Sequence, residues 1–261
     1  MPSLYIAVPV LNEAPNLPRL FDSFRRLASD HSAQFSVHIL LVDDGSTDGT
    51  ADVACQLAGD LAFKVLRHEV NYGPGRAFQT LFSYLADKLQ PGDWVLTMEG
   101  DNTSRYELVR TMFRRAIEED YEVVLASPYL YGGGIVHTSS LRVLLSKVAN
   151  TFVKELLGIN GIVTVSSFFR LYRASALQRL QQRYSPSILE TNGFECMTEM
   201  VIKMINLNLS ISEVPMVLDT QLRIGKSKMK IMRTIRGYLR LALQLRRWKA
   251  PEIPKPSLTR I

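Results

Sequence analysis

The chain has 261 residues, 46% of them hydrophobic, which is enough for one large globular domain with a sizeable core. Its two cysteines, Cys55 and Cys196, are far apart and match no metal-ligand spacing, so we expect reduced thiols in a cytoplasmic protein. Neither a signal peptide nor an apolar run of the roughly 20 residues that span a bilayer is recognisable, so we expect no membrane-spanning segment.

The formal net charge of +6 is unevenly distributed. Residues 221–249 contain ten basic and no acidic residues, whereas the rest of the chain has more acidic than basic side chains. A basic segment of this kind favours contact with phosphate, a membrane surface or nucleic acid. Nucleic acid is the weakest of the three partners, because aromatic stacking positions and a recognition motif are missing.

Along the first hundred residues, short apolar runs alternate with segments of helical periodicity. The expected strands are residues 4–10, 35–42, 63–67 and 94–98, and the expected helices are residues 14–27, 50–57 and 76–89. This regular alternation predicts a parallel, Rossmann-like sheet.

The order of elements loosens in the second half of the chain. The expected helices there are residues 105–120, 141–157, 195–205 and 229–248, and the expected strands are residues 122–126, 167–172 and 210–217. Three glycines at residues 132–134 predict a flexible connector. The last helix is basic and amphipathic, which fits the surface of an anionic membrane and equally fits packing on its own domain or a dimer contact.

Two of the expected strands end abruptly in carboxylates. The second strand runs into Asp43 and Asp44, and the fourth runs into Glu99, Gly100 and Asp101. An open α/β sheet binds its ligands at the carboxyl ends of its strands, so these acids are expected at a binding edge. The first pair suits hydroxyls of a ribose and edges of a base, and the second suits Mg²⁺ or Mn²⁺ bound to a diphosphate. Together they predict the chemistry of a nucleotide-sugar glycosyltransferase.

Three loops add candidates, each with a simpler structural interpretation. Residues 9–13 either hold a nucleobase and ribose or only start a helix. Residues 71–77 either bring backbone amides and Arg76 near a diphosphate or form a plain turn. Residues 223–228 carry arginine and lysines suited to phosphate, or form a solvated basic loop.

Taken in order, these stretches resemble the inverting, GT-A fold glycosyltransferases of family 2, and within them the dolichyl-phosphate mannosyltransferase group, which acts on polyprenyl phosphates. The matching stretches are residues 8–13, 42–48, 71–77, 98–101, 129–134, 169–172 and 223–228. The first four specify the broad family, and the last points to the polyprenyl-phosphate group. The resemblance implies an α/β GT-A fold with a mixed central sheet over residues 1–228, followed by a basic amphipathic helix and a proline-containing tail over residues 229–261.

The resemblance also implies roles for individual residues. The nucleotide would be held by Pro9, Asn12, Glu13, Asp43, Asp44, Asn71, Gly75, Arg76 and Gly100. Asp101 would bind the metal together with Glu99, and Asp101 and Arg223 would act in catalysis. The acceptor phosphate would meet Arg142, Ser146 and Lys228.

Three departures from the family pattern are visible. Glu99 replaces the usual aspartate of the metal motif, Thr103 stands where a glutamine often follows, and Pro128 stands where the mannosyltransferases commonly have arginine. We also expect no counterpart of the family's transmembrane extensions. We therefore expect peripheral contact with the cytoplasmic face of a membrane, directly or through a partner.

The expected function is metal-dependent, inverting transfer of a hexose, with mannose favoured, from GDP-mannose or UDP-glucose to a polyprenyl phosphate. Two alternatives stay open. Transfer to a saccharide hydroxyl would require a carboxylate base, for which Glu195 and Glu199 are candidates. A non-catalytic subunit would bind nucleotide sugar without turnover.

Overall fold

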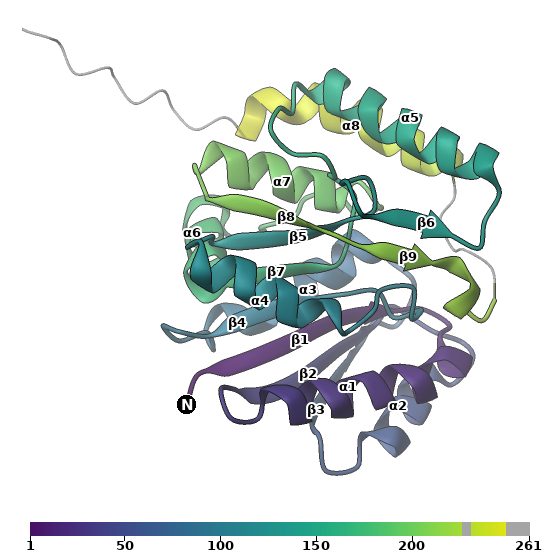
Figure 1. Ribbon diagram of the computed structural model, residues 1–261, viewed down its shortest axis with the longest axis vertical. Coiled ribbons are helices and arrows are strands. Elements are labelled where there is room, and N and C mark those ends of the chain that lie inside the picture. The colour runs from purple at the N-terminus through teal and green to yellow at the C-terminus, as the bar shows by residue number, and fades with distance from the viewer. Residues whose placement is uncertain (226–230, 249–261) are drawn as a thin grey trace, which may run out of the picture.

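The computed structural model describes residues 1–225 and 231–248 and has strands enclosed between helices (Figure 1). The strands are β1 (Ser3–Val10), β2 (Ser36–Asp43), β3 (Ala62–Arg67), β4 (Trp94–Thr97), β5 (Val123–Ser127), β6 (Gly134–Val136), β7 (Arg170–Arg173), β8 (Ile211–Pro215) and β9 (Val217–Asp219). The helices are α1 (Leu17–His31), α2 (Thr50–Ala58), α3 (Pro74–Ala86), α4 (Leu108–Glu118), α5 (Ser140–Leu157), α6 (Ala174–Tyr184), α7 (Cys196–Asn206) and α8 (Ile231–Trp248). Two short 3-10 helices are η1 (Ala14–Asn16) and η2 (Thr220–Leu222).

Seven strands form one sheet in the order β3-β2-β1-β4-β7-β5-β8, and β6 and β9 form a separate parallel pair. The first four strands are parallel, whereas β7 runs antiparallel to both of its neighbours, so the central sheet is mixed, as expected. The strand order reverses at β1, because β2 and β3 lie on one side of it and β4 on the other. A reversal of this kind leaves a crevice at the carboxyl ends of the strands, where α/β proteins bind ligands.

Successive residues of the central strands face opposite sides of the sheet and enter two separate apolar cores. Ile6 and Val8 of β1 pack with α1, α2 and α4, whereas Ala7 packs with α3, α6 and α7. Both faces are covered by helices, which is why the strands are nearly continuous apolar runs. The sheet is thereby held rigidly, and the loops at its carboxyl edge have a fixed base.

The elements differ from the expected ones in three places. Strand β6 has no counterpart among the expected strands, and it begins at Gly134, within the three glycines expected to form a flexible connector, because Gly134 pairs with Val217 of β9. The segment 210–217 forms two strands, because β8 stays in the main sheet while β9 leaves it to pair with β6. Helix α6 has no counterpart among the expected elements. Its buried positions Leu177 and Leu180 form only a narrow stripe among glutamine and arginine residues, which gives a weak sequence signal.

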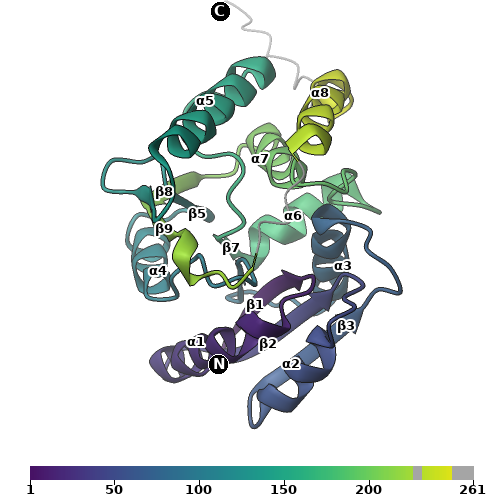
Figure 2. The same cartoon turned by 90° about the vertical axis from the view of Figure 1, so that its right-hand side faces the viewer.

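Helices α5 and α8 contact each other and lie together at one end of the molecule (Figures 1 and 2). Leu241 and Trp248 of α8 are buried against the core, so this helix is seated on the domain. Helix α5 is covered much less, since only Val153 and Leu157 of its 18 residues are buried. Among the described residues, no helix has the length and apolar character needed to cross a bilayer.

Candidate active site

One group of predicted site residues lies at or just after the carboxyl ends of β1, β2 and β4, at the strand-order reversal: Pro9, Asn12, Glu13, Asp43, Asp44, Glu99, Gly100 and Asp101. β1 and β4 are neighbours, and the turn that follows β4 returns to the end of β1. A Cβ atom on Gly100 would lie 2.8 Å from Cγ1 of Val10 and 3.3 Å from the carbonyl oxygen of Pro9. Gly100 therefore permits the close approach of these two strand ends, a packing role that leaves its assignment to the nucleotide a prediction.

Side chains join the loop after β1 to the loop after β2. The Ser46 hydroxyl accepts a 2.8 Å hydrogen bond from the Asn12 amide, and Oδ1 of Asn12 accepts one of 2.8 Å from the Thr47 amide. The Thr50 hydroxyl in turn accepts a 2.8 Å bond from the Glu13 amide. Asn12 has a φ of +50°, a conformation that asparagine tolerates better than most residues. The two predicted nucleotide loops therefore form one preorganised wall of the crevice.

The two acids at the end of β2 have different surroundings. Asp44 is buried, and its carboxylate accepts bonds from the amides of Tyr72 (3.1 Å) and Gly73 (2.8 Å) and contacts Nδ1 of His68 at 2.7 Å. Asp44 thus positions the loop that starts α3. Oδ1 of Asp43 accepts from the Ser46 amide at 2.9 Å, and its Oδ2 has no hydrogen-bond donor in the described part of the chain. Asp43 is accordingly the better placed of the two to meet a ligand hydroxyl.

The glycine loop, residues 71–76, runs into the first turn of α3 and is packed against a second backbone segment. The Gly75 amide donates a 2.9 Å hydrogen bond to the carbonyl of Asn192, and Cβ atoms on Gly73 and Gly75 would overlap the backbone at 191–192. Asn71 and Arg76 at either end of this loop are exposed. The structure therefore explains the two glycines by close backbone approach, and the contribution of this loop to nucleotide binding stays a prediction.

We expect Gly75→Ala to lower the free energy of unfolding by about 1–3 kcal/mol, because a well-packed site must shift to admit the methyl group. The new Cβ would lie 2.9 Å from Cα of Asn192. The atoms that it meets belong to the backbone, which cannot move aside as the end of a flexible side chain could. Chemical denaturation would measure the change. Gly134→Ala is the matched control, since nothing lies within 4 Å of a Cβ at that position. Equal stability of the two variants would contradict the packing role.

The acids after β4 separate into an inward and an outward carboxylate. Glu99 accepts hydrogen bonds from the hydroxyl of Ser104 and from the amide of Phe168, and burial raises the pKa of its carboxyl. Asp101 instead pairs with Arg223, whose Nε and terminal nitrogen lie 2.6 and 2.5 Å from its Oδ2. This arrangement favours Asp101 as the carboxylate that meets a cation, and the ligand role of Glu99 stays a prediction.

The pairing also brings together two residues that are 122 positions apart in the sequence. Arg223 follows η2, and its guanidinium reaches the side chain of Asp101, which is only partly buried. The guanidinium of Arg223 thus occupies one side of the Asp101 carboxylate, and the metal role of Asp101 stays a prediction. The described residues contain no group of three or more histidine, cysteine or acidic side chains that could hold a metal ion. Mg²⁺ is commonly bound by one or two carboxylates plus substrate phosphates, so Asp101 fits such an ion when a diphosphate supplies the other oxygens.

Two of the three predicted acceptor residues, Arg142 and Ser146, are on α5. Arg142 is exposed in the first turn of the helix, and the Ser146 hydroxyl is 2.6 Å from the hydroxyl of Tyr129. Tyr129 belongs to the segment between β5 and β6, so this contact ties α5 to the domain. Lys228 lies outside the described residues.

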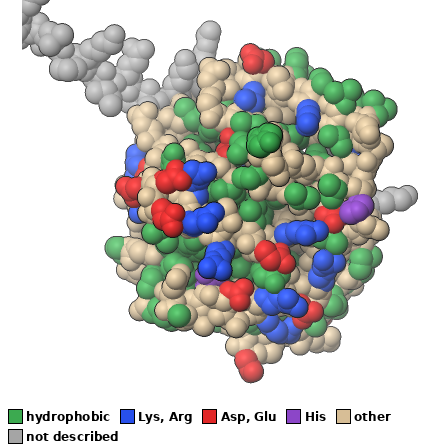
Figure 3. All heavy atoms as spheres, viewed as in Figure 1, with side chains coloured by type: hydrophobic (Ala, Val, Ile, Leu, Met, Phe, Trp, Pro, Cys, Tyr) green, Lys and Arg blue, Asp and Glu red, His purple; other side chains and the backbone are tan. Residues whose placement is uncertain are grey.

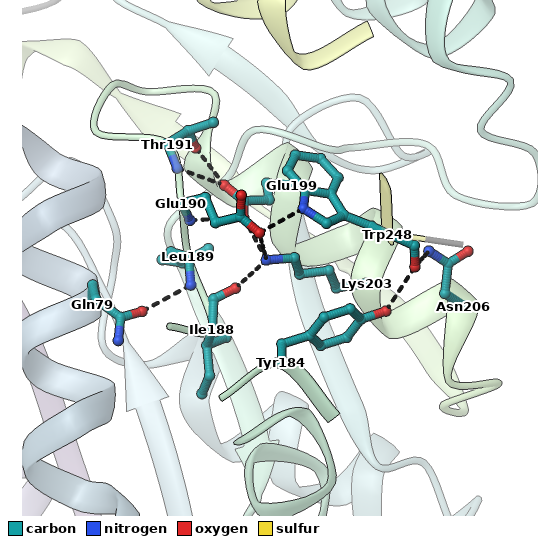
Figure 4. Close-up of polar contacts among 10 residues, drawn as sticks. All are labelled: Gln79, Tyr184, Ile188, Leu189, Glu190, Thr191, Glu199, Lys203, Asn206 and Trp248. Atoms are coloured by element: carbon teal, nitrogen blue, oxygen red, sulfur yellow. Dashed lines mark hydrogen bonds and ion pairs between the residues drawn. The ribbon is translucent and has the colours of Figure 1, made fainter. Parts of the chain in front are cut away.

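The two candidate bases for a saccharide acceptor are both buried on α7 or next to it. Glu199 is fully buried and accepts hydrogen bonds from the amides of Glu190 (2.8 Å) and Thr191 (2.9 Å), and it pairs with Lys203 at 2.6 Å (Figure 4). Glu195 is 9% exposed and sits where Cβ atoms on two glycines would collide with it. A general base must reach the hydroxyl that it deprotonates, so this burial disfavours both residues in that role.

The cluster around Lys203 has a structural role. Its ammonium donates to the carbonyl of Ile188 at 2.7 Å and lies 4.8 and 4.9 Å from the ring centres of Tyr184 and Trp248. Trp248 donates from Nε1 to Oε1 of Glu190 at 2.8 Å, which holds the end of α8 on the domain (Figure 4). The cluster therefore joins α6, α7, α8 and the segment that backs the glycine loop.

The mixed sheet, its order reversal and the acid-bearing loops at that point define a GT-A type transferase fold. The chain belongs to glycosyltransferase family 2, because the model of the family described as "Glycosyl transferase family 2" matches residues 5–181. It is therefore a glycosyltransferase.

Two bacterial relatives match over most of their length. A polyprenol monophosphomannose synthase from Mycolicibacterium smegmatis is 31% identical over 229 residues, which cover 86% of this chain and 80% of the relative. An undecaprenyl-phosphate mannosyltransferase from Micrococcus luteus is 26% identical over 224 residues, 85% of each chain.

Solved structures share the fold at low sequence identity. The glucosyl-3-phosphoglycerate synthase of Mycobacterium tuberculosis, in a crystal structure with Mn²⁺, uridine-diphosphate and phosphoglyceric acid, has a TM-score of 0.64 and 16% identity, over 96% of this chain and 80% of that one. TarS 1–349 of S. aureus, solved with UDP-GlcNAc, has a TM-score of 0.58 and 20% identity, over 93% of this chain and 66% of that one.

Proposed function

We propose that the protein transfers a hexose, with mannose favoured, from a nucleotide-diphosphate sugar to a polyprenyl phosphate, with inversion and with Mg²⁺ or Mn²⁺ as cofactor. The observation that carries this proposal is the 31% identity to a polyprenol monophosphomannose synthase along 86% of the chain. In this proposal residues 1–228 form the transferase domain, and residues 229–261 form a basic extension directed at the membrane.

The reaction would be a direct displacement at the anomeric carbon. An oxygen of the polyprenyl phosphate attacks from the face opposite the nucleotide, its bond to the anomeric carbon forms, and the bond from that carbon to the diphosphate oxygen breaks. A phosphate monoester is anionic at pH 7, so the attacking group needs no strong base. The burial of Glu195 and Glu199 is consistent with such an acceptor.

The leaving nucleoside diphosphate gains charge, which cationic groups must stabilise. Asp101 would hold a divalent metal that neutralises this charge when it is bound. Arg223 would donate to the same phosphates, and Lys228, in the adjoining segment, would meet the acceptor phosphate. The loops that contain Asn12, Glu13 and Asp43 would hold the ribose and base.

The acceptor side is supported by an uncovered apolar surface on α5 and α8. Leu144, Phe152 and Leu243 are 58%, 62% and 85% exposed, and in Figure 3 hydrophobic side chains gather along the upper edge, where Figure 1 draws α5. The same two helices carry exposed basic residues, Arg142 on α5 and Arg240 on α8. Helices with exposed apolar and basic side chains suit an anionic lipid surface, where a polyprenyl phosphate would be found.

We expect the double variant Leu144→Glu/Phe152→Glu to lose at least about tenfold in affinity for vesicles that contain anionic phospholipid. Two apolar contacts of about 1.5–3 kcal/mol each are replaced by charges that the lipid repels. Co-sedimentation with the vesicles would measure the change. Ile117→Glu on α4 is the control, because Ile117 is 55% exposed and lies on another helix. Unchanged binding of the α5 variant would remove this helix from the membrane contact.

A transfer assay tests the proposed function directly. Purified protein would receive labelled GDP-mannose or UDP-glucose, a polyprenyl phosphate and Mg²⁺ or Mn²⁺, with EDTA in the control. Metal-dependent label in the organic phase would support the proposal and name the donor. Tight donor binding without such transfer would contradict it and favour a saccharide hydroxyl as acceptor.

A further inference from the structure

Asn16 has no role implied by the family resemblance. It lies between the segment that carries Asp101 and the segment that carries Arg223. It is 1% exposed and ends η1, just after the loop predicted to hold the nucleotide. Its Oδ1 accepts a 2.8 Å hydrogen bond from the amide of Ile224, and its Nδ2 donates to the carbonyl of Ile224 at 3.1 Å. The orientation of the side-chain amide follows from these partners, because the Ile224 N–H requires an acceptor. Asn16 therefore pairs with both backbone groups of one residue.

The same residue also contacts the segment that bears Asp101. The carbonyl oxygen of Asn16 accepts a 2.9 Å bond from Nδ2 of Asn102, which directly follows Asp101 and has a φ of +65°. Ile224 directly follows Arg223. Asn16 thus touches the neighbour of each member of the Asp101–Arg223 pair, although Ile224 is 208 positions away in the sequence.

In the part of the chain that the structure describes, the hydrogen bonds of Ile224 are the two to Asn16. The Ile224 side chain is 60% exposed, and a Cβ on the exposed Gly225 would meet nothing within 4 Å. A neutral amide suits this position, because it satisfies a peptide N–H and a carbonyl together without adding charge. A carboxylate there would face Oε2 of Glu13, to which Nδ2 of Asn16 donates at 2.5 Å.

We infer that Asn16 is a positioning residue for glycosyl transfer: its side-chain amide holds the backbone after Arg223 so that Arg223 and Asp101 face the same diphosphate. This inference rests on the proposed function, in which these two residues act on the leaving group. Asn16 itself touches no substrate in this role. Its effect on the rate passes through Arg223, which sets it apart from a residue that only stabilises the fold.

The test compares Asn16→Ala and Asn16→Asp with the wild-type protein. We expect the Ile224 amide to exchange with deuterium at least about tenfold faster, because Asn16→Ala removes its acceptor and Asn16→Asp places a carboxylate against that of Glu13, which pushes the side chain away. We expect kcat to fall about 30- to 100-fold, since small displacements of a positioned group have effects of this size. Gln178→Ala is the control, because Gln178 also donates to a distant carbonyl, that of Leu89 at 3.0 Å, on α6. That variant should leave both quantities unchanged.

A double-mutant cycle separates positioning from general stability. If Asn16 acts through Arg223, adding Asn16→Ala to Arg223→Ala should lower kcat by less than about threefold further. The inference would be overturned if the effects of the two substitutions on kcat multiplied in the double variant. It would also be overturned if Asn16→Ala left either kcat or the exchange of the Ile224 amide unchanged. If the wild-type protein transfers no sugar to polyprenyl phosphate, the proposed function fails on its own. In that case the deuterium exchange of the Ile224 amide, measured with GDP and Mn²⁺ present, still tests whether Asn16 fixes the backbone at Ile224.

Discussion

Asp101→Asn should reduce sugar transfer by about a thousandfold while leaving the fold intact. A divalent metal contributes several kcal/mol to the stabilisation of a departing diphosphate, and about 4 kcal/mol corresponds to this factor. Asparagine keeps an oxygen that can accept from the amide and hydroxyl of Thr103, which now bond Oδ1 at 3.1 and 2.6 Å. The rate of transfer and the binding of Mn²⁺ in the presence of GDP are the two measurements.

The matched control for this variant is Asp52→Asn. Asp52 also pairs with an arginine, Arg67 at 2.5 Å, but its side chain is 70% exposed, and it lies on α2 and is not among the predicted site residues. We expect this variant to keep full activity, because exposed ion pairs contribute little. Full activity in Asp101→Asn, by contrast, would remove the metal assignment.

Lys203→Met should lower the free energy of unfolding by about 3–5 kcal/mol. Lys203 and Glu199 both have fully buried side chains, and removing one member of a buried pair leaves the other charge uncompensated. The substitution also removes the ammonium group that contacts the rings of Tyr184 and Trp248, which weakens the packing of α8 on the domain. Urea denaturation would measure the change, with the slope of the transition as a check on two-state behaviour.

Two companion variants make this prediction specific. Lys88→Met removes an exposed lysine that lies 4.5 Å from the ring centre of Tyr84, so it deletes a similar cation–π contact without burial. We expect it to change stability by less than about 1 kcal/mol. The double variant Lys203→Met/Glu199→Gln should recover most of the loss, because no buried charge remains. A Lys203→Met protein as stable as Lys88→Met would show that the pair contributes nothing.

The strand ends were predictable because their signal is local. An apolar run that stops at carboxylates marks both the end of a buried strand and the edge of the sheet that binds ligands, which is why Asp43, Asp44 and Asp101 fall in one crevice. The mixed sheet followed from the family resemblance. Helix α6 was missed because its apolar stripe is narrow, and β9 because nothing in a short apolar run shows which strand it will pair with.

The roles of neighbouring polar residues depended on contacts that no local pattern contains. Glu99 and Asp101 are two positions apart, yet one accepts bonds from the protein interior and the other pairs with Arg223. Glu199 is a candidate base by residue type, whereas its carboxylate is enclosed by Lys203 and two backbone amides. Periodicity describes which face of an element is apolar, and it carries no information about which distant backbone meets a polar side chain.

The sequence by itself determined the class of fold, the binding edge of the sheet and the basic character of the C-terminal helix, because apolar periodicity, strand-end acids and charge are properties of short segments. Only the tertiary structure decided that Asn16 holds Ile224 and that α5 leaves its apolar side uncovered. Both depend on chain segments brought together across the sheet, where burial and hydrogen bonding are set by packing of the whole domain.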